Sequence, residues 1–195
     1  MQYPTASSDL FPVESNKCFS WFAKAIRSVP LIYVNQIGAN DNLIFDGNSF
    51  ILDKNGSKIK QLKSFSEDLS SWDIEQTIPE KNKLNQSEIS SIFDALVLGV
   101  RDYAKKCGFK TALIGLSGGI DSALVSAIAT AALGSNNIYC VSMPSKWSSS
   151  HSKSDARDLA RRLKINFNSI PIENLMSSFE AVSYTHLTLP TKRIV

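Results

Sequence analysis

The sequence predicts an α/β protein built from two unlike parts, and three observations support this prediction. Residues 30–62 contain short apolar runs separated by turn residues, which is typical of β-strands. Residues 111–170 alternate apolar runs with helical patterns, which indicates a doubly wound parallel sheet. Residues 71–86 are polar and include Pro79, so we expect a linker between the two parts.

The first part, residues 1–70, is expected to contain a β meander. Three apolar runs predict its strands, at 31–34, 43–45 and 49–52. The dipeptide Asn55-Gly56 marks a tight hairpin turn, because both residue types tolerate the positive φ that such turns need.

The second part, residues 87–181, is expected to begin with a helix. Ser87 is a suitable N-cap for it, and Gly108 is a suitable residue to end it. The elements expected after it are a strand at 111–116, a helix at 120–133 ended by Gly134, a strand at 138–143, a helix at 152–163 and a strand at 166–170.

The most informative motif is Gly-Leu-Ser-Gly-Gly-Ile-Asp-Ser at residues 115–122, which we call the phosphate loop. It lies between a predicted strand and a predicted helix, where unpaired amides and the helix dipole favour an anion. It has no lysine and therefore departs from the Walker A pattern. Ser117 and Ser122 offer hydroxyl groups, and the Asp121 carboxylate could hold Mg²⁺. We therefore expect a cradle for the phosphates of a nucleotide.

The nucleotide site is expected to extend to Met143, which lies at the carboxyl end of the second predicted strand of the sheet. The residues predicted to contact ATP are Gly115, Leu116, Ser117, Gly118, Gly119, Ile120, Asp121, Ser122 and Met143. Lys146 could reach a phosphate or lie in water, and His151 is expected to be a solvated loop residue.

Composition limits the class of protein. The chain is 43% hydrophobic and 20% charged, and it shows no apolar stretch of membrane-spanning length and no signal-peptide pattern, so we expect a cytoplasmic protein. A net charge of +3 with scattered lysines does not favour nucleic acid or membrane partners. Three widely spaced cysteines, Cys18, Cys107 and Cys140, suggest neither disulfides nor a zinc site.

SGGIDS at 117–122 resembles the PP-loop of the ATP pyrophosphatases. The stretch from 96 to 179, which includes LVLGVRDYAKKCGFKTALIGLSGGIDSALV, resembles the synthetase domain of glutamine-dependent NAD synthetases. IYVNQIGANDNLIFDGNSFILDKNG at 32–56 is similar to the closing strands of the nitrilase-like glutaminase domain of that family. The resemblance thus implies the end of a nitrilase-like αββα domain, followed by the first half of a PP-loop domain.

This resemblance implies a chemistry, with ATP and Mg²⁺ as cofactors and Asp121 as the metal ligand. Deamido-NAD would attack the α-phosphate of ATP, and ammonia from glutamine would displace AMP to give NAD. The full-length parent is expected to be a homo-oligomer. Two alternatives stay open: another PP-loop enzyme, of the GMP synthetase or tRNA-thiolating type, or a non-catalytic nucleotide-binding fragment.

The sequence also departs from the family pattern at both ends. The glutamate, lysine and cysteine of the glutaminase are expected upstream of this segment, so Cys18 is expected to be an ordinary thiol and the chain itself inactive. The stretch 5–7 resembles a glutamine-contacting segment, which implies a role for Ser7, but the basic residue expected a few positions later is missing. VSYTHLTLPT at 182–191 matches the translation of a sequencing-library adapter, so 182–195 is expected to be foreign to the family.

Overall fold

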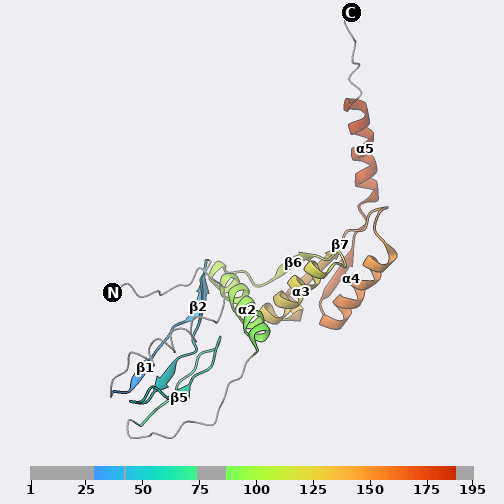
Figure 1. Cartoon of the computed structure of the whole chain (residues 1–195). Helices are drawn as coiled ribbons and strands as arrows, with labels where there is room; N and C mark the ends of the chain where they lie inside the picture. Colours follow the sequence, from blue (N-terminus) through green and yellow to red (C-terminus); the bar gives the residue numbers. More distant parts are fainter. Residues whose placement is uncertain (1–28, 42, 74–86, 188–195) are drawn as a thin grey trace, which may run out of the picture. The chain divides into compact units, whose positions relative to one another are not determined.

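A computed structural model describes residues 29–41, 43–73 and 87–187, with the backbone alone for 181–187 (Figure 1). Ser7, Cys18 and most of the predicted linker lie outside the described residues. The chain divides into two compact units between Phe109 and Lys110. The helix that the sequence assigned to the second part therefore belongs to the first compact unit, and the domain limits given above stay a prediction.

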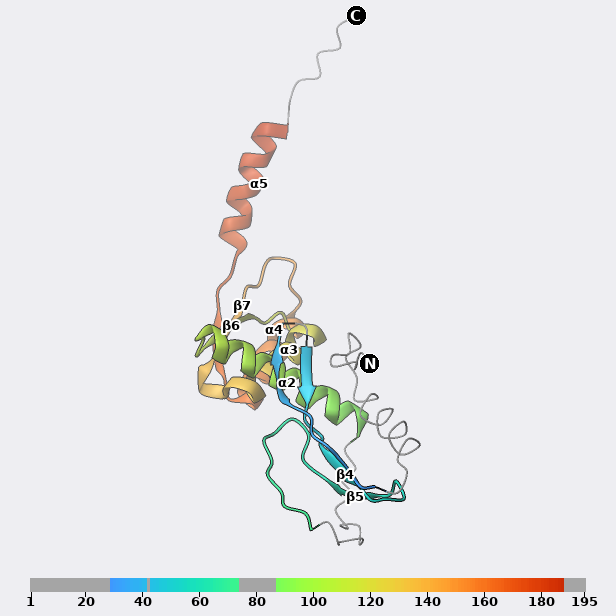
Figure 2. The same ribbon diagram turned by 90° about the vertical axis from the view of Figure 1, so that its left-hand side faces the viewer.

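The strands of the first unit form two small antiparallel sheets. One sheet has the order β1 (Leu31–Tyr33), β4 (Phe50–Leu52), β5 (Lys58–Gln61), and the other pairs β2 (Ile37–Asn40) with β3 (Leu43–Asp46). Figure 2 shows β4 and β5 side by side. The predicted meander is wrong, because β1 pairs with β4 while the chain between them folds into a hairpin of its own.

Two of these strands were not predicted, because they carry few apolar side chains. β2 reads Ile-Gly-Ala-Asn, and β5 reads Lys-Ile-Lys-Gln with only Ile59 fully buried. The Asn55-Gly56 turn is present, and the Asp53 carboxylate accepts hydrogen bonds from the amides of Asn55 and Ser57. Polar side chains at the turn therefore compensate for the weak strand pattern of β5.

The helix α2 (Glu88–Cys107) begins and ends where the sequence predicts. The Ser87 side chain accepts a hydrogen bond from the amide of Ser90, and Gly108 ends the helix with a φ of 74°. α2 packs on β2 and β3, where Ala39 donates its amide to Asp102 Oδ2 at 2.8 Å and Lys106 Nζ donates to the Ala39 carbonyl. Two side chains of α2 thus form hydrogen bonds with both the amide and the carbonyl group of Ala39 in β2.

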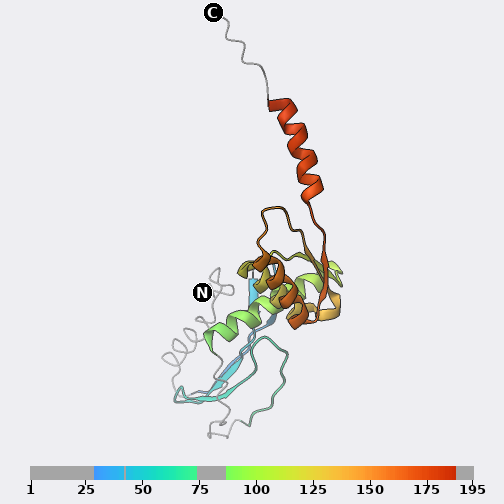
Figure 3. The same cartoon turned by 90° about the vertical axis from the view of Figure 1, so that its right-hand side faces the viewer.

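The second unit contains the predicted parallel sheet, with strand order β6 (Ala112–Gly115), β7 (Ile138–Ser142), β8 (Asn166–Ser169). The connecting helices are α3 (Ile120–Leu133) and α4 (Ser150–Leu163), which contact each other and lie side by side (Figure 3). Their small side chains pack on the strands in one core. The buried members of this core are Leu116, Ala129, Ile138, Cys140, Ala156, Ala160 and Ile165.

Only one face of this sheet is covered by the described helices of the second unit. Alternate strand residues point to the other face, where Leu113 is 74% exposed and Tyr139 is 46% exposed. The parallel sheet is therefore present, but the second helical layer of a doubly wound fold is not found among the described residues of this unit. A last helix, α5 (Glu173–Leu187), follows β8. No helix in the described ranges is long and apolar enough to cross a membrane.

Candidate functional site

The phosphate loop begins directly at the carboxyl end of β6. The Leu116 amide donates to the Val141 carbonyl at 2.9 Å, and the Leu116 side chain is buried in the core of the second unit. These contacts fix the start of the loop to the neighbouring strand β7. The chain leaves the sheet at Ser117, at the edge where parallel α/β sheets bind ligands.

The loop closes on itself through its two serines. The hydroxyl groups of Ser117 and Ser122 lie 3.1 Å apart. Ser117 Oγ also accepts from the amide of Gly119 at 3.2 Å, and Ser122 Oγ donates to the Gly119 carbonyl at 2.9 Å. The two predicted hydroxyl groups are therefore close together, although both hydroxyls make hydrogen bonds within the loop.

Gly118 is the position with the strictest steric requirement. Its φ is +88°, and a Cβ atom there would lie 2.2 Å from the carbonyl oxygen of Ser152. Ser152 belongs to the first turn of α4, and its amide donates to the side chain of Ser149, the N-cap of that helix. The phosphate loop therefore lies against the N-terminus of α4. Sequence analysis missed this contact, although Ser149 three residues before Ser152 is a recognisable capping pattern.

The amino end of α3 is the second helix terminus at this edge of the sheet. Its N-cap is Gly119, which has no side chain to accept hydrogen bonds from the amides of the first turn. Unpaired amides and the positive end of the helix dipole favour an anion at such a position. Asp121 lies in the same first turn and is exposed.

Met143 is the remaining residue predicted to contact a nucleotide. An ideal Cβ atom built on Gly115 would lie 3.7 Å from Met143 Cε, and the Met143 side chain is 53% exposed. The exit of β7 thus lies beside the start of the phosphate loop. Leu116 is buried, so only its backbone is available to a ligand, whereas Ile120 is 80% exposed.

The titratable groups around this edge are few. Among the described residues, no three His, Cys, Asp or Glu side chains lie close enough together to hold a metal ion. Asp121 is an exposed carboxylate in the phosphate loop and does not belong to a cluster of this kind. His151 is exposed on the first turn of α4. Cys140 is buried near Ser126, and burial raises the pKa of its thiol, which makes it a poor nucleophile.

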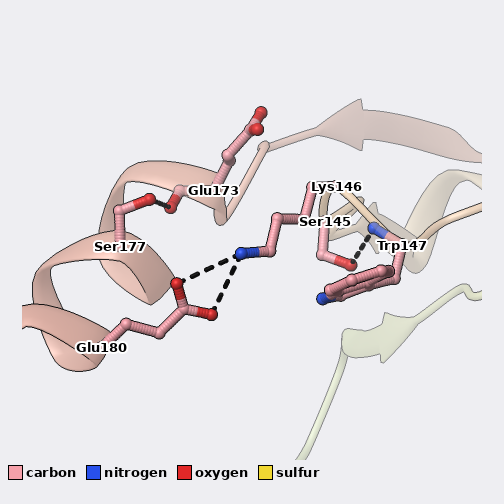
Figure 4. A network of polar contacts seen from close by, with 6 residues as sticks. All are labelled: Ser145, Lys146, Trp147, Glu173, Ser177 and Glu180. Atoms are coloured by element: carbon pink, nitrogen blue, oxygen red, sulfur yellow. Dashed lines mark hydrogen bonds and ion pairs between the residues drawn. The ribbon is translucent and has the colours of Figure 1, made fainter. Parts of the chain in front are cut away.

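Lys146 lies in the loop between β7 and α4, and its ammonium group forms an ion pair. Its Nζ atom donates to both carboxylate oxygens of Glu180 on α5, each at 3.1 Å (Figure 4). The same atom lies 5.3 Å from the centroid of the Trp147 ring. The cation is thus held between a carboxylate and an aromatic face.

The sequence and the fold of this chain were compared with those of known proteins. The family model described as NAD synthase matches residues 92–192, which is more than half of the chain. A glutamine-dependent NAD(+) synthetase of Synechocystis is 48% identical over 158 residues, covering 78% of this chain and 28% of the relative. A protein of the same name from Rhodobacter capsulatus is 41% identical, covering 80% of this chain and 29% of the relative.

Solved structures give the same result. The glutamine-dependent NAD+ synthetase of Acinetobacter baumannii, solved in complex with ADP, matches 95% of this chain and 36% of that chain with a TM-score of 0.85 and 32% identity. The corresponding enzyme of Cytophaga hutchinsonii matches with a TM-score of 0.80 at 17% identity, which supports the fold alone. The chain spans about a third or less of the length of these relatives. With the family model, the sequence relatives and the fold in agreement, this chain belongs to the NAD synthase family.

Proposed function

We propose that this chain is the ATP-binding part of a glutamine-dependent NAD synthetase. The observation that carries the proposal is the phosphate loop, whose Gly118 permits a backbone contact with α4 that any side chain would prevent. The loop joins a parallel strand to a helix with a glycine N-cap, which is the arrangement that binds phosphate through backbone amides. The related enzyme from Acinetobacter baumannii was solved with ADP, which supports an adenine nucleotide as the ligand.

The proposed reaction has two steps. The nicotinate carboxylate of deamido-NAD attacks the α-phosphate of ATP, which forms an acyl adenylate and releases pyrophosphate. Ammonia derived from glutamine then attacks the acyl carbon, and AMP leaves with the formation of NAD. The residues of this chain would bind the pyrophosphate portion of ATP: the loop amides and the hydroxyl groups of Ser117 and Ser122 would donate to its oxygens.

Asp121 is the residue that would hold Mg²⁺, because it is the carboxylate of the phosphate loop. Bound there, Mg²⁺ would neutralise part of the negative charge that develops on the departing pyrophosphate. Met143, beside Gly115, would contact the adenine with its exposed side chain. Ser7 lies outside the described residues, so its proposed contact with glutamine rests on the sequence alone.

We also propose a division of the chain along the lines of this family. Residues 1–70 would be the end of a nitrilase-like glutaminase domain, 71–86 a linker, and 87–181 the beginning of the PP-loop domain. The tail at 182–195 remains a predicted foreign segment, although the family match extends to residue 192. Deamido-NAD and glutamine-derived ammonia are the proposed substrates, and the full-length protein is proposed to be a homo-oligomer. The names of the relatives favour this function over a GMP synthetase or a tRNA-thiolating enzyme.

Titration calorimetry of the chain with ATP tests the proposal. We expect ATP binding to tighten when Mg²⁺ is added, and Asp121→Ala to lose this dependence on Mg²⁺. Asp155→Ala is the matched control, because Asp155 is an exposed acid on α4 of the same unit and lies outside the phosphate loop. Equal Mg²⁺ dependence in the parent and in Asp121→Ala would refute the metal assignment, and no ATP binding by the parent would refute the nucleotide site.

A further inference from the structure

The phosphate loop contains neither lysine nor arginine, although the triphosphate of ATP carries several negative charges. Besides the Mg²⁺ proposed for Asp121, any positively charged side chain that binds these phosphates would therefore belong to another segment. The loop that follows β7, residues 143–149, contains one lysine or arginine, Lys146. This loop starts at Met143, beside Gly115 of the phosphate loop, and ends at Ser149, the cap of the helix that Gly118 contacts. Both ends of the segment that carries Lys146 thus lie next to the phosphate loop.

Lys146 is held on a well-defined turn. The amide of Ser145 donates to Ser148 Oγ at 3.0 Å, and the amide of Ser148 donates to the Ser145 carbonyl at 3.1 Å. Ser145 Oγ accepts from the amide of Trp147 at 3.2 Å, as Figure 4 shows. These hydrogen bonds fix the backbone on both sides of Lys146, so the position of its side chain depends on rotation about its own bonds and on its partners.

The partner of Lys146 is easily exchanged. Its ion pair with Glu180 is open to solvent, since the two side chains are 38% and 50% exposed. Ion pairs of this exposure contribute little to stability. α5 is attached more firmly at its base, where the amide of Ile172 donates to the Pro144 carbonyl at 3.0 Å. Loss of the ion pair would therefore free Lys146 and leave the start of α5 attached to the strand exit.

We propose that Lys146 binds a phosphate group of ATP and that Glu180 competes with the nucleotide for it. This inference rests on the proposed function of the phosphate loop. ATP would replace the single carboxylate of Glu180 with more highly charged phosphate oxygens, and lysine is a common partner of phosphate. Glu180 has two opposing consequences: it keeps Lys146 ordered in the free protein, and it lowers affinity for ATP because its own charge repels the phosphates.

The competition predicts opposite effects for the two partners, which a merely structural ion pair would not produce. In calorimetry with ATP and Mg²⁺, Lys146→Met should weaken binding about tenfold, as expected for loss of one charge-assisted hydrogen bond. Glu180→Gln should strengthen binding by about threefold, the range of an exposed charge pair. In the Lys146→Met background, Glu180→Gln should change ATP affinity much less, because the lysine for which it competes is absent.

Four controls separate the phosphate contact from other effects. Glu173→Gln makes the same charge change on the same helix, and in Figure 4 the Glu173 carboxylate points away from Lys146, so ATP affinity should stay unchanged. Lys110→Met removes a lysine that precedes β6, at the opposite end of that strand from the phosphate loop, and should also have no effect. Lys146→Arg keeps the charge and should retain most of the affinity. Adenosine, which has no phosphate, should bind the parent and Lys146→Met equally.

The outcomes distinguish this inference from the proposed function. If Lys146→Met binds ATP as tightly as the parent, or if Glu180→Gln weakens binding as Lys146→Met does, the competition is refuted while the nucleotide site stands. If the parent itself does not bind ATP, both proposals fail. Circular dichroism and the melting temperature of each variant establish that it is folded; if Lys146→Met is not, the comparison of Glu180→Gln with Glu173→Gln decides.

Discussion

The two compact units of this chain are stabilised in different ways. The first unit buries apolar side chains such as Leu52 and Ile59, but polar side chains join its distant segments as well, as when Asp102 accepts from the amide of Ala39 across 63 residues. In the second unit, alternating strands and helices bury a continuous apolar core. The position that tolerates added volume least is Gly118 of the phosphate loop. The first unit should therefore be sensitive to loss of single polar groups, and the second to added volume.

Gly118→Ala should cause the largest loss of stability. The new methyl group would meet the Ser152 carbonyl oxygen at 2.2 Å, and alanine is also strained at a φ of +88°. Overpacking and backbone strain together should lower the free energy of unfolding of the second unit by about 3 kcal/mol. Urea denaturation followed by circular dichroism measures this loss.

Gly134→Ala is the matched control for backbone strain. Gly134 has a similar φ of +85°, but a Cβ atom there meets nothing within 4 Å. We expect this variant to lose about 2 kcal/mol, because a φ of 85° with a ψ of 147° is a conformation that residues other than glycine rarely adopt. Equal losses in the two variants would show that the contact between Gly118 and α4 has no energetic importance.

Asp102→Ala should have an intermediate effect on the first unit. The Ala39 amide would lose its acceptor at the interface between α2 and β2, and an unsatisfied amide of this kind costs about 1–3 kcal/mol. Hydrogen exchange of the Ala39 amide should become faster in this variant. Asp102→Asn keeps an oxygen acceptor and should retain most of the protection, whereas equally fast exchange in both variants would show that the negative charge matters more than the hydrogen bond.

Asp46→Asn should have the smallest effect, and its sign depends on pH. Burial raises the pKa of the Asp46 carboxyl above its ordinary value, despite hydrogen bonds from its own backbone, Asn48 and Asn35 that lower it. The folded state therefore binds the proton of Asp46 more tightly than the unfolded state does. At neutral pH, where the carboxylate is ionised, this burial lowers the free energy of unfolding. Asparagine removes that charge and can still accept from Asn35 Nδ2, which lies 2.8 Å from Asp46 Oδ1.

We expect the asparagine variant to be equally stable at pH 7, or more stable by no more than about 0.5 kcal/mol, since solvent screens a partly exposed charge. As the pH falls through the folded pKa, Asp46 takes up its proton and the parent gains stability relative to the variant. Urea denaturation at several pH values measures this difference. A parent that instead loses stability relative to the variant on acidification would contradict the direction of the pKa shift.

The sequence predicted the local elements of the second unit well, because their patterns are local. The limits of α3 and the three parallel strands follow from side-chain period and from glycines at helix ends, and in the first unit the capping serine of α2 was predicted in the same way. The pairing of β1 with β4 could not be predicted, because it depends on a hairpin inserted between them and not on the residues of either strand. Phe65, with a φ of 55°, also adopts a conformation that could not be predicted, because bulky aromatic residues rarely have a positive φ.

The candidate site was predictable in part for the same reason. The phosphate loop is one continuous motif, so its residues could be named from the sequence. Two of its neighbours could not be predicted: Ser152, which contacts Gly118 through its backbone, and Glu180, which reaches Lys146 from a helix 34 residues away in the sequence. A backbone carbonyl has no sequence signature, and the pairing of two exposed charges depends on where the helix α5 starts.

The glycine N-cap of α3 has a consequence for the thermal behaviour of the protein. Most helices receive their cap from a side chain of the chain itself, but in α3 a phosphate group would take that role. The order of the first turn of α3 would then depend on the concentration of free nucleotide, and the melting temperature would rise with each increase in that concentration. In a cell, the supply of ATP would thus help to determine how long the folded second unit survives proteolysis, in addition to the role as a substrate that is proposed for it above.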